Sequence, residues 1–320
     1  MKAAVVMTAG QTPRYADFSE PTPGAGESKI AVTAAAISQL VRSRASGRHY
    51  SSSGKFPFVA GVDGVGRLED GRRVYFVMPR APYGGMAERA VAPSAHCLAL
   101  PDDLDDVTAA AIANPGMSSW AALEERARLK AGETVLINGA TGASGRLAVQ
   151  IAKHLGAKKV VATARNLEAL KSLAGLGADV TIPLVDDAAA LEDRFGHEFA
   201  QGIDVVLDYL WGKSAERLII AGAKSGAEAV PIRFVQIGSV SGSDITLPSA
   251  ALRSSAIVLM GSGIGSIPLD RLIRAIDRLF RATVLAGFKI ATHAARLSDV
   301  EQAWSRDDSA SRTVLTIGAP

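Results

Sequence analysis

One strand-turn-helix stretch constrains the fold of this 320-residue chain more than any other feature of its sequence. An apolar run of β character, residues 135–137, ends in a turn that carries Gly139, Gly142 and Gly145. Apolar residues then recur over 147–155 with the 3.6-residue period of an amphipathic helix. Free backbone N–H groups and the positive end of a helix meet at such a turn, which predicts a binding site for a pyrophosphate.

The spacing of the three glycines is Gly-x-x-Gly-x-x-Gly, and glycine spacing alone is a weak signal. The next apolar run adds specificity. About twenty residues past the turn, where an NAD site places a carboxylate, residues 163–166 read Thr-Ala-Arg-Asn and contain no acid. The planar fork of Arg165 suits a 2′-phosphate, so the sequence favours NADP(H) over NAD(H). The alternatives are that Arg165 is a solvated loop residue and that Lys171 is either a second phosphate ligand or a surface lysine.

Length and composition indicate a compact α/β protein of two domains. Hydrophobic residues make up 48% of the chain and 31 residues are glycine. A net charge of +3 is too small to predict a nucleic-acid or membrane partner. Cys97 is the only cysteine, and the apolar N-terminal run is too short for a signal peptide, so we expect a cytoplasmic protein.

The two parts of the chain show different patterns. Up to about residue 100, short β-type runs alternate with Gly and Pro and predict a small, largely antiparallel barrel; the main runs are 29–37, 62–68, 73–78 and 86–91. An alanine-rich helix follows Pro101. From 114 to 288, strands and helices alternate in the pattern of a doubly wound parallel sheet. Its expected strands are 135–138, 160–163, 180–182, 205–207, 234–237 and 257–260.

The C-terminal part is predicted to return to the first domain. After a last long helix, we expect a β-like run at 288–291, a short helix at 300–304 and a strand at 313–317. The predicted domains are therefore 1–113 with 289–320, and 114–288. Arginines 271, 274, 278 and 281 line one face of the long helix, but Asp270 and Asp277 interrupt them, which indicates a solvated face.

Several motifs together resemble the zinc-free quinone oxidoreductase branch of the medium-chain dehydrogenase/reductase superfamily. The resemblance covers nearly the full length and depends on residues 47–50, 57–66, 114–120, 139–145, 176–179 and 204–208. It implies a GroES-like catalytic domain, a Rossmann cofactor domain, a cleft between them and a homodimer joined at the edge of the cofactor sheet. Zinc-dependent relatives have a cysteine at about Ser38 and Gly-His-Glu where this chain has Gly61-Val62-Asp63, so no metal is expected.

The resemblance also assigns roles to individual residues. Backbone N–H groups of Ala143 and Ser144 would meet the pyrophosphate, Ser118 would lie near the nicotinamide, Gly238 and Ser239 would border its ribose, and Tyr50 would face the substrate. Alternatively, Tyr50 only packs, and Ser118-Ser119 is a helix N-cap. Many quinone reductases have Asn near 38 and Tyr near 184; this chain has Ser38 and Leu184. The full set of predicted cofactor residues is Ser118, Asn138, Gly139, Thr141, Gly142, Ala143, Ser144, Gly145, Arg165, Lys171, Gly238 and Ser239.

These features favour an NADPH-dependent, zinc-independent reductase of a small quinone or activated enone, with Tyr50 as the candidate proton donor. Two alternatives stay open. One is an enoyl reductase acting on an acyl thioester, for which Arg42, Arg44 and Arg48 are candidate phosphate ligands. The other is a non-catalytic NADPH-binding sensor or structural protein. The pair Tyr209 and Lys213 has the spacing of a short-chain dehydrogenase pair but follows a strand, and we interpret it as a coincidence.

Overall fold

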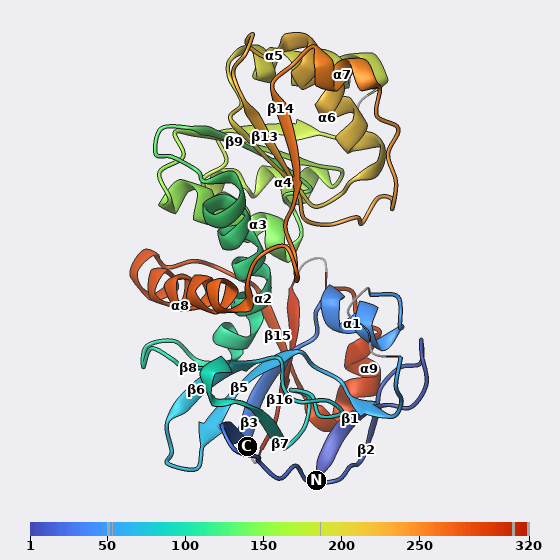
Figure 1. Ribbon diagram of the computed structural model, residues 1–320, viewed down its shortest axis with the longest axis vertical. Helices are drawn as coiled ribbons and strands as arrows, with labels where there is room; N and C mark the ends of the chain where they lie inside the picture. The colour runs from blue at the N-terminus through green and yellow to red at the C-terminus, as the bar shows by residue number, and fades with distance from the viewer. Residues whose placement is uncertain (50–51, 53, 186, 309–310, 319–320) are drawn as a thin grey trace. The chain divides into compact units, whose positions relative to one another are not determined.

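A computed structural model describes residues 1–49, 52, 54–185, 187–308 and 311–318 (Figure 1). The chain divides into two compact units. Unit 1 comprises Met1–Asn114 with Ile276–Pro320, and unit 2 comprises Pro115–Ala275. The first crossing falls within helix α2 (Asp106–Ala121) and the second within helix α8 (Leu269–Ala286). The return to unit 1 therefore occurs earlier than residue 289.

Unit 2 contains the doubly wound sheet that the alternating pattern predicts. Its six strands are all parallel and lie in the order β11-β10-β9-β12-β13-β14. Strands this apolar are typical of parallel sheets, because helices cover both faces. The strands are β9 (Thr134–Asn138), β10 (Lys159–Ala164), β11 (Val180–Pro183), β12 (Val205–Asp208), β13 (Ile232–Gln236) and β14 (Ile257–Gly261).

The helices of unit 2 are distributed over both faces of this sheet. Figure 1 shows α5 (Ala188–Ala200) and α6 (Gly212–Ser225) on one face and α3 (Ala143–His154) on the other. Phe195 and Phe199 of α5 pack with Phe234 of the sheet in one buried cluster. The two short helices are α4 (Leu167–Lys171) and α7 (Ser249–Arg253), and a π-helical turn, Ala122–Ala127, continues α2.

Unit 1 is built from two sheets that are largely antiparallel, as the short β-type runs predict. The larger has the order β15-β16-β3-β5-β6-β8, with β7 also paired to β3, and the smaller has the order β2-β1-β4. Small helices α1 (Gln39–Ala45) and α9 (Val300–Trp304) complete this unit. The strands are β1 (Lys2–Val6), β2 (Arg14–Asp17), β3 (Glu27–Ala36), β4 (Phe58–Val59), β5 (Asp63–Leu68), β6 (Arg73–Val77), β7 (Arg89–Pro93), β8 (Cys97–Ala99), β15 (Thr292–Arg296) and β16 (Arg312–Thr316).

Three local predictions are wrong. The strand expected at 288–291 lies at Thr292–Arg296, and that expected at 86–91 begins only at Arg89. Ser118 and Ser119 are not an N-cap, because α2 continues through Pro115 and both hydroxyls donate to the Pro115 carbonyl within the helix.

The arginine-bearing face of α8 is solvated, as its interrupting acids predict. Arg274 pairs with Asp270 at 2.9 Å and Arg281 pairs with Asp277 at 3.0 Å, all with exposed side chains. Among the helices of the described chain, none is both long and apolar enough to span a membrane.

Candidate active site

The carboxyl ends of the parallel strands of unit 2 form one edge of the sheet, and the predicted cofactor residues gather there. The glycine turn follows β9, Arg165 follows β10, and Gly238 and Ser239 follow β13. From β9 the chain proceeds to β10 and β11 on one side, and it then crosses back to β12, β13 and β14 on the other side of β9. A crevice at such a switch point is where open α/β sheets bind ligands.

The three glycines of the turn have different roles. Gly139 has a φ of +90°, which favours glycine. A Cβ on Gly145 would overlap the Gly139 carbonyl and come within 2.5 Å of the Ala140 Cα, so glycine here lets α3 pack against the turn. Gly142 is the N-cap of α3 and has ordinary φ and ψ, and a Cβ placed on it would have no other atom within 4 Å.

The amino end of α3 has the properties of an anion site. Gly142 has no side chain that could accept a hydrogen bond from the first helical turn. The N–H groups of the first turn point out of a helix N-terminus, where the helix dipole also favours negative charge. Ala143 and Ser144 belong to this turn, and Thr141 precedes it with a partly exposed side chain. The turn therefore offers backbone donors beside open space.

A buried polar network fixes the strand ends beneath the turn. The Asn138 amide donates to Asp208 at 2.8 Å and to Ser214 at 2.9 Å, and it accepts from the Thr163 hydroxyl at 2.7 Å. Asp208 also accepts from the backbone N–H groups of Leu210 and Trp211. Burial raises the pKa of Asp208, and these donors oppose the rise. With its amide fully engaged, Asn138 acts by holding β9, β10 and β12 in register.

A second network joins α2 to the same edge of the sheet. The Ser119 and Tyr209 hydroxyls lie 2.8 Å apart, and Ser119 also lies 3.1 Å from the carbonyl oxygen of Ser144 in the first turn of α3. Ser118, expected near the nicotinamide, is the neighbour of Ser119 on α2. Sequence reasoning missed Ser119 and the role of Tyr209, because 90 residues separate the two.

Tyr209 is not a proton donor at the surface. It is 8% exposed, and burial raises the pKa of its phenol further above the ordinary value. Lys213 is exposed and pairs with Glu216 at 2.8 Å. The carbonyl of Tyr209 also lies 2.7 Å from where a Cβ on Gly238 would stand, so only glycine fits as the chain leaves β13. Ser239 follows with an exposed side chain.

The residues after β10 present positive charge. Arg165 is exposed, and its guanidinium has no hydrogen bond or ion pair with any described residue. Lys171 is exposed and pairs with Glu168 at 2.8 Å. Arg146 on α3 donates to Ser172, the C-cap of α4, at 3.0 Å. Sequence reasoning missed Arg146, although its position three residues into α3 directs it toward α4.

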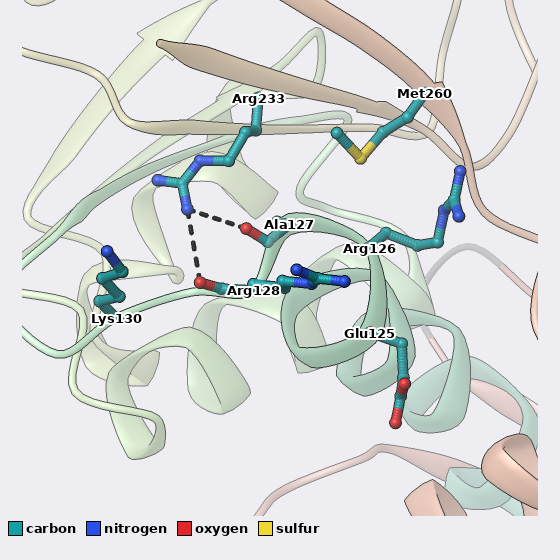
Figure 2. A pocket seen from close by; sticks show the side chains of 7 residues that line it. All are labelled: Glu125, Arg126, Ala127, Arg128, Lys130, Arg233 and Met260. Atoms are coloured by element: carbon teal, nitrogen blue, oxygen red, sulfur yellow. Dashed lines mark hydrogen bonds between the residues drawn. The ribbon is translucent and has the colours of Figure 1, made fainter. Parts of the chain in front are cut away.

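A basic hollow of about 540 Å³ lies elsewhere in unit 2 (Figure 2). Arg233 donates to the carbonyls of Ala127 and Arg128 at the end of the π-helical turn, and it pairs with Glu133 at 2.8 Å. Cations that meet the last carbonyls of a helix stabilise its end. The lining contains none of the predicted cofactor residues, so we interpret this hollow as structural.

The positions of the zinc ligands of relatives do not fit a metal in unit 1. The Ser38 hydroxyl caps α1 by accepting from Val41 N–H at 3.0 Å, and Val62 is apolar. Asp63 is buried and accepts from the Tyr75 hydroxyl at 2.7 Å. Within the described ranges, no three His, Cys, Asp or Glu residues lie close enough to hold a metal ion. Tyr50, the candidate proton donor, lies outside the described residues.

Burial dominates the electrostatics around Asp63. It raises the pKa of Asp63 to about 6, against the opposing hydrogen bond from Tyr75 and the charge of Arg312. Arg312 is 7% exposed, and its Nε and Nη2 atoms have no hydrogen-bond partner among the described residues. Burial correspondingly lowers the pKa of Arg312.

Comparison with known proteins agrees with this architecture. Residues 143–281 match the family model described as zinc-binding dehydrogenase. A protein of Emericella nidulans named "Probable NADPH-dependent quinone reductase tdiC" is 31% identical over 364 residues, covering 99% of this chain and all of that protein. The mycocerosic acid synthase-like polyketide synthase of Mycobacterium tuberculosis is 33% identical over 240 residues, covering 71% of this chain but 11% of the synthase.

A solved structure extends the agreement to the whole fold. The quinone oxidoreductase from Thermus thermophilus, determined alone and with NADPH, is 27% identical and superposes with a TM-score of 0.80, covering 99% of this chain and all of that one. The glycine turn, the six-stranded sheet and these similarities place the chain in the quinone oxidoreductase branch of the medium-chain dehydrogenase/reductase superfamily.

Proposed function

We propose that this protein is an NADPH-dependent reductase that transfers hydride to a quinone or an activated enone. The observation that carries the proposal is the strand-end edge of unit 2. There, an uncapped helix N-terminus faces open space at Gly142, and Arg165 has no partner among the described residues where an NAD site would have an acid. The similarity to an NADPH-dependent quinone reductase over the full chain supports the same cofactor and substrate class.

Particular residues would hold NADPH at this edge. The N–H groups of Ala143 and Ser144 would bind the pyrophosphate, and Arg165 the 2′-phosphate, with Lys171 and Arg146 adding positive charge nearby. Ser118 would lie beside the nicotinamide, and Gly238 and Ser239 beside its ribose. When bound, the cofactor supplies the hydride. The protein orients the acceptor and excludes water, and Tyr50 donates a hydrogen bond or proton to the acceptor oxygen.

The cofactor assignment is tested by Arg165→Ala. A charge-assisted bond to a phosphate contributes about 1.5–3 kcal/mol, so we expect the KM for NADPH to rise about tenfold or more and the KM for NADH to change less than about twofold. Arg274→Ala, which removes an exposed arginine from α8, is the matched control and should change neither. Equal effects of Arg165→Ala on both cofactors would remove Arg165 from the phosphate site.

We further propose that turnover needs no zinc. The proposal is supported by Ser38, whose hydroxyl caps a helix, and by Val62, which offers no donor. Activity should persist after dialysis against a chelator, with substoichiometric zinc by elemental analysis. Stoichiometric zinc that is lost together with activity would contradict this.

An enoyl reductase acting on an acyl thioester is the second candidate. It is favoured by the similarity of 71% of this chain to a segment of a polyketide synthase. Crotonyl thioester and a small quinone should be compared as hydride acceptors in the same assay. A higher kcat/KM for the thioester would select this candidate, whereas NADPH binding without turnover of either acceptor would indicate a sensor.

We also propose that the chain is a cytoplasmic homodimer joined through β14. In the described part of the sheet, β14 pairs on one side only, with β13, and Val258 on it is 46% exposed. A charge on an edge strand opposes pairing with a second chain. Val258→Lys should therefore convert dimer to monomer in size-exclusion chromatography with light scattering. A wild-type monomer would contradict the proposal.

A further inference from the structure

Unit 1 contains a cavity of about 500 Å³ that neither the cofactor nor a metal explains. Two cations, Arg44 and Lys55, line it together with apolar side chains, and no Asp or Glu does so among the described residues. The apolar part of the lining includes Val41, Phe56, Phe58 and Val62. A cavity of this size with an apolar wall and few polar groups is typical of a small-molecule site.

Arg44 is the group that gives this cavity its chemical character. Its side chain is partly buried, and burial lowers the pKa of its guanidinium. The guanidinium has no hydrogen bond or ion pair with any described residue. His49 lies close enough for the charge of Arg44 to help burial lower the pKa of its imidazole, so this neighbour supplies no negative charge.

Arg42, on the same helix, has the contacts of an arginine with a structural role and serves as a comparison for Arg44. It pairs with Asp308 at 3.1 Å, donates to the carbonyls of Trp304 and Arg306, and stacks on the Trp304 ring. Arg42 thus holds α1 against the C-terminal segment and is unsuited to a ligand. The Arg44 guanidinium has no such partner in the described part of the chain, and a half-buried cation is unfavourable unless something neutralises it.

We propose that this cavity binds ligands in which a compact anionic group, a carboxylate or a phosphate, is joined to an apolar body. Arg44 takes the anion with its planar fork, Lys55 adds positive charge, and Phe56 and Phe58 contact the body. The proposal rests on the proposed reductase function in one respect, because it takes the bound acid to be the substrate of the reductase. Binding itself needs neither NADPH nor turnover, so the two proposals fail separately.

The test compares 2-naphthoate with the neutral 2-naphthalenemethanol by fluorescence titration of the full-length protein without cofactor. We expect the wild type to bind 2-naphthoate at least about tenfold more tightly than the alcohol, since a charge-assisted pair contributes at least about 1.4 kcal/mol. Arg44→Gln should abolish the preference, and Arg44→Lys should restore part of it. Arg128→Gln removes an arginine of the basic hollow in unit 2 whose side chain also has no partner among the described residues, and it should leave the preference unchanged.

Equal affinity of the wild type for both probes would overturn the proposal, as would an unchanged preference in a folded Arg44→Gln variant. Competition separates two sources of the anion. Displacement of 2-naphthoate by hexanoate at lower concentration than by pantetheine 4′-phosphate assigns the site to free acids, and the reverse order assigns it to the phosphate of a thioester carrier. Failure of both to compete would also contradict the proposal.

Discussion

Each unit buries a carboxyl group at a strand end, but the hydrogen bonding of the two groups differs. In unit 2, the Asp208 carboxylate accepts hydrogen bonds from the Asn138 amide and from two backbone N–H groups. In unit 1, within the described residues, the Asp63 carboxyl accepts one hydrogen bond, from Tyr75, and the nearby Arg312 has two buried nitrogen atoms without a partner. A satisfied network makes a site rigid, whereas an incompletely satisfied one costs stability.

This difference matches what each unit does. The Asp208 network fixes the strand ends that carry the residues proposed to bind the cofactor. Asp63 stands where zinc-dependent relatives are expected to have the acid of Gly-His-Glu, yet Ser38 and Val62 provide no ligands there. We infer that the first network holds the strand ends in place and that Asp63 and Arg312 form a buried, incompletely hydrogen-bonded pair.

The largest effect is expected from Asn138→Leu. The substitution keeps the branched shape of the side chain but leaves Asp208, Ser214 and Thr163 each with a lost partner, and a buried unsatisfied group costs about 1–3 kcal/mol. We expect a loss of about 4 kcal/mol in the free energy of unfolding, measured by urea titration with Trp fluorescence. Ser214→Ala, which removes one partner alone, should cost about 1 kcal/mol. Equal costs for the two variants would show that the network is not cooperative.

A smaller effect, dependent on pH, is expected from Asp63→Asn. The folded-state pKa of about 6 lies above the ordinary value of 3.8, so the folded protein keeps a proton that the unfolded chain releases between about pH 4 and 6. Stability from this group is present below about pH 4 and is lost as the pH rises through about 6. The wild type should therefore lose about 3 kcal/mol relative to the variant between about pH 4 and 7.

Thermal unfolding at several pH values measures this slope. Asp70→Asn is the control, because hydrogen bonds from Arg72 lower the pKa of this exposed carboxyl and its removal should act in the opposite sense. A wild type whose stability rises from about pH 4 to 7 in parallel with that of Asp63→Asn would show that Asp63 is ionised in the folded state.

The smallest effect is expected from Arg312→Met at about pH 5, where most of the Asp63 carboxyl is protonated. Replacing a buried, incompletely bonded cation by an apolar side chain of similar length is often neutral or stabilising. We expect a change of less than about 1 kcal/mol in the free energy of unfolding. A loss above about 3 kcal/mol would show that Arg312 is a necessary partner of Asp63.

The elements that sequence reasoning locates are those with a local signature. The six parallel strands are short runs rich in apolar residues, and the turn before α3 contains three glycines. The extent of helix α2 is harder to predict, because proline usually ends a helix, whereas Pro115 lies inside one. The amphipathic pattern of α8 is strong enough to predict both its buried and its solvated face.

What could not be predicted depends on contacts between distant parts of the sequence. The Ser119 and Tyr209 pair joins helix α2 to the residue that follows β12. The sequence alone does not distinguish the roles of Arg42 and Arg44, because both are arginines on the same short helix. Asp308, more than 260 positions away along the chain, decides which of them has a structural partner.

The three glycines of the turn have a practical consequence for anyone wishing to silence this protein while keeping it intact. Altering Gly139 or Gly145 would distort the scaffold, so loss of activity there would report only on misfolding. A methyl group at Gly142 would have no other atom within 4 Å and would point into the open space beside the helix end. A substitution at Gly142 can therefore block a ligand at the helix end while the fold stays intact.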